Sequence, residues 1–400
     1  MLPIDRALEG LGLGGSVQVL PVLSGYPSPK YINLVLRRDD RGTLLFESSV
    51  ARPDVVAEVE KTLKTAGVRA LDAVLVTHCH GDHAGGAGLV AAYGRERGER
   101  APIHLHSRGF RQLSHPEASF LNETYELFLA RSQWGLLEYN QLADEDMVGH
   151  AIRLRYAGYF SRTPKSAMRF VDHGHLPEGI VAVHTPGHSP DCCLYYDERL
   201  QFAVPGDTII TTGKPEEQGS AAYVVPIFWM GEVYSMAYLG FLRTIGVLRR
   251  FFETHEVRVI FPPHGRFAVT EPFAWCDFAA GYFEGIYRAL LDDFLGDAKA
   301  GWRTRPFRAC DLNPYIPSAG AHPISTPSHT FGMLCMLADE GYLSMSEHPH
   351  SRQITFGVEK MPPEGLVAVL LAQDPGPIEV FRGSQAAGRN MLPSRPRRSR

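Results

Sequence analysis

The chain reads Thr77-His78-Cys79-His80-Gly81-Asp82-His83 directly after the apolar run Leu71–Val76. Three histidines and one carboxylate therefore fall within six residues. The apolar run predicts a buried strand, so these side chains stand in the loop where that strand ends. Burying so many ionisable groups without a partner is costly. Imidazole and carboxylate are ligands that suit zinc, and less exclusively iron or manganese, so we expect a bound divalent cation here.

Three further loops carry a histidine or an aspartate directly behind an apolar strand. They read His184-Thr185-Pro186-Gly187-His188 after Ile180–Val183, Gly206-Asp207 after Phe202–Val204, and Pro262-Pro263-His264-Gly265 after Val257–Ile260. Proline and glycine in these loops are the residues that turns require. Loops at strand ends are where α/β folds assemble their sites, so these loops are expected to complete the metal site.

The four motifs, in this order and at this spacing, resemble those of the metallo-β-lactamase superfamily. The likeness consists of His-x-His-x-Asp-His followed by Ala84-Gly85-Gly86, then Thr-Pro-Gly-His, Gly-Asp and Pro-x-His-Gly, and it covers Val17 to about Leu295. The resemblance implies an α/β fold, the αββα metallo-β-lactamase sandwich, with the site at one edge between two sheets. It says much less about the substrate, because this superfamily includes lactamases, thioesterases, lactonases and nucleases.

Carried over residue by residue, the resemblance implies a site for two metal ions per chain. The first ion would take three imidazoles, from His78, His80 and His188. The second would take one carboxylate and two imidazoles, from Asp82, His83 and His264, and Asp207 would bridge the two ions. Asp82 would also be the catalytic residue that holds the attacking water and accepts its proton. Histidine rather than glutamate at position 80 favours Zn²⁺ over the di-iron redox variants of this fold, although iron or manganese can occupy such ligands.

Three residues near the motifs add to this pattern. Relatives often carry aspartate in the loop where this chain has Glu47, which would either orient a ligand by a hydrogen bond or be a solvated acid at a strand end. His184 precedes the Thr-Pro-Gly-His loop and is a candidate for the same supporting role. Cys79 stands between two ligands and is expected to point away from them as a spacer.

The ligand motifs fall in a catalytic domain that we predict to span residues 1–300. Helical periodicity over Pro53–Ala66 follows three strand-like runs. Residues 110–170 are rich in helix formers and aromatic side chains, which predicts a helical insertion that caps the site. Residues 301–390 are expected to form a small α+β extension, in which a helix over 328–341 and a hairpin over 342–358 are compatible with a winged-helix-like module. The basic stretch 391–400 is expected to be a disordered tail.

Composition and charge narrow the class of protein. A formal net charge of −4 argues against a broad nucleic-acid surface, though not against a local basic patch. No apolar run is long enough to cross a membrane, and the N-terminus lacks the pattern of a signal peptide. Six cysteines without a Cys-x-x-Cys pair favour a reduced, cytoplasmic protein. The oligomeric state is open, although a symmetric homodimer is the commonest arrangement.

The ligand set predicts a hydrolase. Two zinc ions close together lower the pKa of a shared water, so that hydroxide exists at neutral pH and attacks a carbonyl or phosphoryl group. The acidic balance and the aromatic-rich cap favour a small-molecule ester, thioester or lactone, and Phe228 and Trp229 would either line an acyl pocket or pack in the core. A nuclease of the same fold is the alternative, and a metal-binding scaffold without activity is the third reading.

Overall fold

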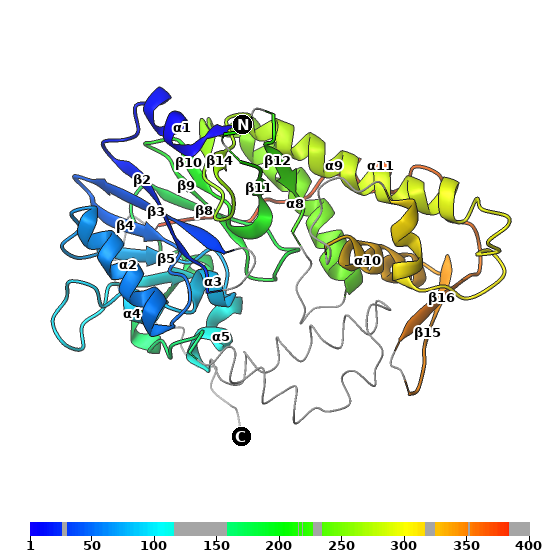
Figure 1. The fold of residues 1–400 in the computed structure, drawn as a ribbon, viewed down its shortest axis with the longest axis horizontal. Coiled ribbons are helices and arrows are strands. Elements are labelled where there is room, and N and C mark those ends of the chain that lie inside the picture. Colours follow the sequence, from blue (N-terminus) through cyan, green and yellow to red (C-terminus); the bar gives the residue numbers. More distant parts are fainter. Residues whose placement is uncertain are drawn as a thin grey trace, which may run out of the picture.

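The computed structural model describes residues 1–25, 30–115, 158–214, 216–217, 219–226, 234–316, 325–350 and 353–383 of the 400-residue chain. Most of the predicted cap, the aromatic pair Phe228 and Trp229, and the basic tail lie outside these residues. Two mixed β-sheets pack face to face, and helices cover the outer face of each (Figure 1). This is the αββα sandwich that the sequence predicts.

The first sheet has six strands in the order β2-β3-β4-β5-β6-β7. Strands β2 to β4 are antiparallel neighbours, whereas β4 to β7 run parallel, so the carboxyl ends of the parallel strands meet at one edge. The strands are β2 Val17–Leu23, β3 Tyr31–Asp39, β4 Gly42–Phe46, β5 Ala73–Leu75, β6 Ile103–Leu105 and β7 Met168–Phe170.

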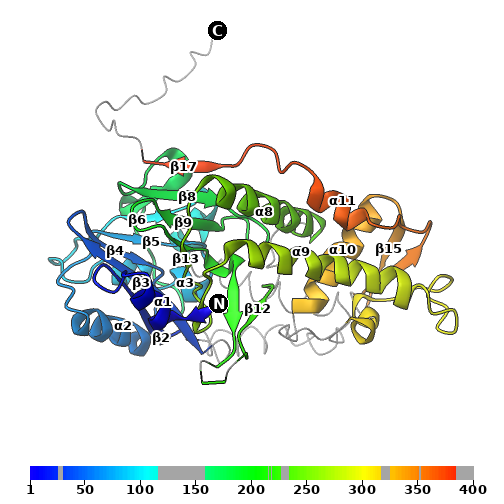
Figure 2. The ribbon, with the colours of Figure 1, turned by 90° about the horizontal axis from the view of Figure 1, so that it is seen from above.

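The second sheet has five strands in the order β13-β10-β9-β8-β17. Its edge strand β17 comes from the far end of the described chain and pairs antiparallel with β8 (Figure 2). The pair β10 and β13 is parallel, and the remaining neighbours are antiparallel. The strands are β8 Ile180–His184, β9 Cys193–Asp197, β10 Phe202–Val204, β13 Val259–Ile260 and β17 Val380–Arg382.

Three pairs of short strands lie outside these sheets, and each pair is antiparallel. They are β1 Leu2–Pro3 with β14 Phe267–Ala268, β11 Ile210–Thr212 with β12 Ala222–Val224, and β15 Leu343–Glu347 with β16 Ile354–Val358. The α-helices are α1 Ile4–Gly10, α2 Pro53–Thr65, α3 Gly81–Ala84, α4 Ala87–Val90, α5 Phe110–Ser114, α8 Tyr234–Thr254, α9 Pro272–Arg288, α10 Ser325–Asp339 and α11 Leu366–Ala372.

Alternate residues of the strands face opposite hydrophobic cores, as the two-residue period of a strand requires. In β5, Val74 packs in the core formed with α2 and α4, whereas Leu75 faces the space between the sheets. In β8, Val183 packs in the core that α8, α9 and α10 share, and Ala182 faces the space between the sheets. Because the central strands β5, β8, β9 and β10 are buried on both faces, polar side chains gather where these strands end.

Several predicted elements are confirmed by the structure. The helix expected over Pro53–Ala66 is α2, the helix expected over 328–341 is α10, and the expected hairpin is β15 with β16. Two short strands of the main sheets were missed: β7 lies in the segment assigned to the helical insertion, and β17 lies in the extension. Helix α10 shares a core with the second sheet. The domain boundary at residue 300 and the winged-helix likeness stay predictions.

Among the described residues, no helix is both long enough and apolar enough to cross a membrane.

Candidate metal centre

Four of the seven predicted ligands stand in the loop that follows β5 and in the short helix α3. His78 and His83 are almost completely buried, and His80 and Asp82 are 8% exposed. The single turn of α3 begins at Gly81 and brings Asp82 and His83 back over the loop, where the backbone N–H of His83 donates to the carbonyl of His80. One short stretch therefore presents four ligand side chains to a common space.

His78, His80 and His188 form the first group of candidate ligands. Nδ1 of His80 lies 2.9 Å from Nε2 of His78 and 3.0 Å from Nε2 of His188, which comes from the loop between β8 and β9. Burial, and then the charges of neighbouring imidazoles, hold the pKa values of His78 and His80 well below the ordinary value. Both rings are therefore neutral at neutral pH, which is the form that binds a metal.

Asp82, His83 and His264 form the group of candidate ligands that the resemblance assigns to the second ion. Nε2 of His264 lies 3.2 Å from Oδ2 of Asp82, and Nε2 of His83 lies 3.7 Å from Oδ1 of the same carboxylate. Nδ1 of His264 lies 3.1 Å from the carbonyl of Tyr31, so its N–H donates there and leaves Nε2 for the cluster. Burial raises the pKa of Asp82, but His83 and His264 outweigh it and the net shift is downward.

Asp207, in the short 3-10 helix Gly206–Thr208 after β10, lies between the two groups. Its Oδ1 is 3.3 Å from Nε2 of His83 and 3.4 Å from Nε2 of His264. Its Oδ2 is 3.4 Å from Nε2 of His188. One carboxylate oxygen thus faces each group, which is the placement that a bridging ligand needs.

The donor set fits divalent cations. Oδ1 of Asp207 and Nε2 of His83 are buried without a hydrogen bond, an arrangement that is costly unless another partner is supplied. Within each group, the ligand atoms lie within 4.8 Å of one another, a span that atoms sharing one ion can cover. Imidazole and carboxylate are ligands that zinc, iron and manganese accept.

Glu47 supports this cluster from the end of β4. Its carboxylate is completely buried, and Oε1 lies 3.2 Å from Nδ1 of His83, the ring nitrogen that faces away from Asp207. Thr77 donates to Glu47 through its backbone N–H at 3.3 Å and its hydroxyl at 2.5 Å, and the hydroxyl oxygen lies 3.1 Å from Nδ1 of His78. Glu47 is therefore not a solvated acid at a strand end. It contacts the candidate ligand His83, as the supporting role requires.

Two supporting residues were missed in the sequence. Asn33 of β3 donates through its side-chain amide to the carbonyls of Pro262 and Gly265, and so holds the loop that carries His264. Asp191 accepts from the backbone N–H of Cys79 at 2.9 Å and from the hydroxyl of Ser189. A polar side chain inside an apolar strand was the available signal for Asn33.

Two other residues near the motifs, Cys79 and His184, are buried beside the ligand loops. Cys79 is buried in the core beneath the first sheet, as expected for a spacer. His184 is 7% exposed and contacts the loop that carries His188 through the carbonyl of Pro190.

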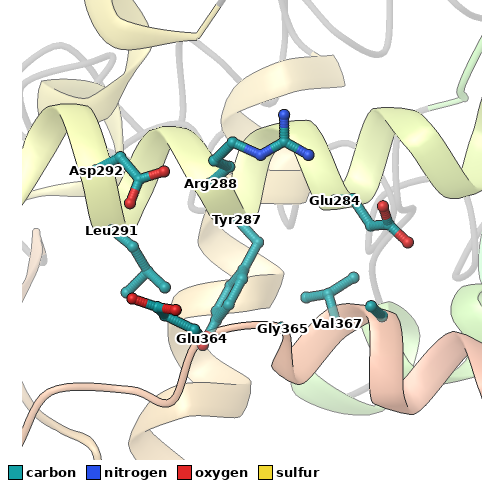
Figure 3. A pocket seen from close by; sticks show the side chains of 9 residues that line it. Glu284, Tyr287, Arg288, Leu291, Asp292, Glu364, Gly365 and Val367 are labelled. Atoms are coloured by element: carbon teal, nitrogen blue, oxygen red, sulfur yellow. The ribbon is translucent and has the colours of Figure 1, made fainter.

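A separate cavity of about 350 Å³ lies between the end of α9 and α11 (Figure 3). Its lining carries three carboxylates and one guanidinium, from Glu284, Asp292, Glu364 and Arg288. None of its lining residues belongs to the cluster of candidate ligands. The cavity and the candidate metal centre are therefore separate sites.

Sequence comparison identifies the family. The family model of the metallo-beta-lactamase superfamily matches residues 31–246, which is more than half of the chain. The chain therefore belongs to the metallo-beta-lactamase superfamily, whose members are generally metal-dependent hydrolases. No curated protein sequence matches it.

Solved structures agree with this assignment at the level of the fold. A metallo-beta-lactamase family protein from Thermus thermophilus is 19% identical, with a TM-score of 0.59 over 87% of this chain and 100% of that chain. A beta-lactamase domain protein from Burkholderia ambifaria is 17% identical, with a TM-score of 0.59 over 86% of this chain and 92% of that chain. At such identities the likeness shows the fold alone.

Proposed function

We propose that this chain is a binuclear zinc hydrolase that cleaves a small-molecule ester, thioester or lactone. The observation that carries the proposal is Asp207, whose two carboxylate oxygens face different groups of candidate ligands. A mononuclear site needs no such carboxylate between two sets of imidazoles. Two zinc ions bound here would supply hydroxide at neutral pH and would polarise the bond to be cleaved.

The side chains of the protein would have two roles, which are to bind the metal ions and to accept one proton from the attacking water. His83 and His264 hold the pKa of Asp82 below its ordinary value against the effect of burial, so this carboxylate is ionised at neutral pH. An ionised oxygen of Asp82 would orient the attacking water by accepting its hydrogen and would then receive its proton. His83 cannot take that role equally well, because its ring is completely buried.

The exposed edge of the cluster indicates where a substrate approaches. His80, Asp82 and Asp207 are 8–9% exposed, whereas His78 and His83 are at most 1% exposed. A carbonyl group presented at this edge would come next to Asp82. The net charge of −4 favours a small acyl substrate over a polyanionic nucleic acid. All six cysteines are free thiols, which supports our further proposal of a cytoplasmic location.

Metal content and hydrolysis, measured on one sample, test the proposal. Protein purified without added metal would be analysed for zinc, iron and manganese, and then assayed with an acyl-thioester, a lactone and a phosphodiester reporter. We expect close to two zinc ions per chain and acyl cleavage that chelation abolishes. Phosphodiester cleavage alone would establish the nuclease instead. Less than one metal ion per chain after reconstitution would overturn the metal centre itself.

A further inference from the structure

The loop that presents His188 is attached to the C-terminal part of the chain. Strand β17 pairs with β8, and its register places Val380 opposite Val183, next to the start of that loop (Figure 2). The backbone N–H of His184 donates to the carbonyl of Glu379 at 3.0 Å. Glu379 therefore stands beside His184 at the base of the ligand loop.

The side chain of His184 connects Glu379 to the ligand loop. Its Nδ1 lies 2.6 Å from Oε2 of Glu379, and its Nε2 lies 2.9 Å from the carbonyl oxygen of Pro190. The two ring nitrogens thus face oxygens of two different segments, the carboxylate of Glu379 and the carbonyl of Pro190. The ring also stacks on His106, with 4.5 Å between centroids and 24° between planes. These contacts fix the ring, and the ring fixes the carbonyl of Pro190.

We propose that Glu379 is a positioning residue for the metal centre. Acting through His184, it holds Pro190 and with it the loop that aims Nε2 of His188 at His78 and His80. This inference rests on the proposed metal centre, but not on the reaction that the centre catalyses. It assigns part of the centre to Glu379, the residue before β17, which lies outside the residues 31–246 matched by the family model.

The inference predicts an effect on one metal ion more than on the other. His188 belongs to the group with His78 and His80, whereas the group of Asp82, His83 and His264 receives no ligand from this loop. Loss of a group that orients a ligand typically weakens metal binding by about 10–100-fold. Since Glu379 is 57% exposed and acts through a second residue, we expect Glu379→Ala to weaken one stepwise binding constant by about 10-fold, at the lower end of that range.

The matched variants separate positioning from general stability. Glu379→Gln keeps an acceptor for Nδ1 of His184 without the charge, so it should recover part of the lost affinity. Glu198→Ala is the control, because Glu198 forms an ion pair with Arg382 of the adjoining strand β17 and is 41% exposed. No contact of that pair reaches the ligand loop in the part of the chain that the structure describes.

The experiment is a zinc titration of metal-free protein against a chromophoric chelator, with the thermal midpoint of each metal-free variant recorded alongside. We expect one weakened constant in Glu379→Ala, a smaller change in Glu379→Gln, and wild-type constants in Glu198→Ala. Equal constants in Glu379→Ala and Glu198→Ala, or an equal loss in both constants of Glu379→Ala, would overturn the positioning role. If the wild type binds two zinc ions but hydrolyses none of the reporters, the proposed reaction fails while these constants still test Glu379.

Discussion

The two halves of the metal cluster are built in different ways. His78, His80, Asp82 and His83 come from one loop and one helical turn, and Glu47 at the neighbouring strand end supports them. The other three ligands come from loops after three separate strands, and distant segments hold the loops of His188 and His264.

The distant supports reach across the whole sandwich. The hydroxyl of Thr244 in α8 donates to the carbonyl of Pro186 at 2.7 Å, and Asn33 of the first sheet holds the loop of His264. Glu379 of the C-terminal segment reaches His184. The ligands of the contiguous half are thus set close together by one loop and one helical turn, whereas the dispersed half depends on the assembly of the complete fold.

The strongest test of this comparison is Asp207→Ala, which removes the residue of the dispersed half that lies between the two groups of ligands. We expect loss of metal and a loss of activity beyond the effect of about 10–100-fold typical of a supporting residue, because each group would lose a ligand. The fold should suffer little, since Asp207 lies in a short 3-10 helix rather than in a core strand. Elemental analysis and far-ultraviolet circular dichroism would check both points. Retention of two metal ions by this variant would refute the bridging assignment.

The contiguous half can be tested separately with Glu47→Gln. Oε1 of Glu47 faces Nδ1 of His83 and the hydroxyl of Thr77, and Oε2 accepts from the backbone N–H of Thr77, so the amide places an NH₂ group against a donor. We expect zinc affinity to fall by about 10–100-fold. The chelator titration measures it, and Glu58→Gln is a control because Glu58 accepts only from the backbone of Leu23 among the contacts described. Unchanged affinity in Glu47→Gln would mean that the contact with His83 contributes nothing to metal binding.

The contrast between contiguous and dispersed ligands also explains how much of the fold and of the site the sequence could predict. Four ligands within six residues behind an apolar strand form a local pattern, and three further strand-end motifs made the fold recognisable. Strand β17 could not be predicted in this way, because three residues carry no measurable period and their partner β8 lies far earlier in the chain. The proposed role of Glu379 depends on that pairing, so no local sequence pattern could predict it.

His329 shows the same limit for a buried polar side chain. When a single histidine stands in an apolar helix, the neighbouring sequence does not tell whether its side chain packs in the core or has a functional role. In the structure, its Nε2 donates to the carbonyl of Pro226 at 2.6 Å and its Nδ1 lies 2.9 Å from the hydroxyl of Tyr282. These partners come from a loop and from α9, so only the tertiary structure reveals that the ring is held neutral and satisfied.

The smallest expected effect is the pH dependence of stability. It is tested at two buried histidines, one in the first sheet and one in α10. Burial lowers the pKa of His104 in β6 to about 4, and it lowers the pKa of His329 in α10 to about 4 as well. The ordinary value of 6.5 applies to the unfolded chain, so below it the unfolded state binds more protons than the folded state. The stability that each neutral ring contributes is therefore complete above pH 6.5 and is lost as the pH falls toward 4.

Urea unfolding of the metal-free protein at pH 6.5 and at pH 5 would measure this loss. Each buried histidine should account for about 1.5 kcal/mol of the fall in the free energy of unfolding between these values. His104→Gln and His329→Gln should each reduce the fall by about that amount. His348→Gln, at an exposed position, shows what a surface histidine contributes. If only one of the two buried variants flattens the pH dependence, the other histidine is accessible to protons in the folded state, and the first sheet and α10 differ in rigidity.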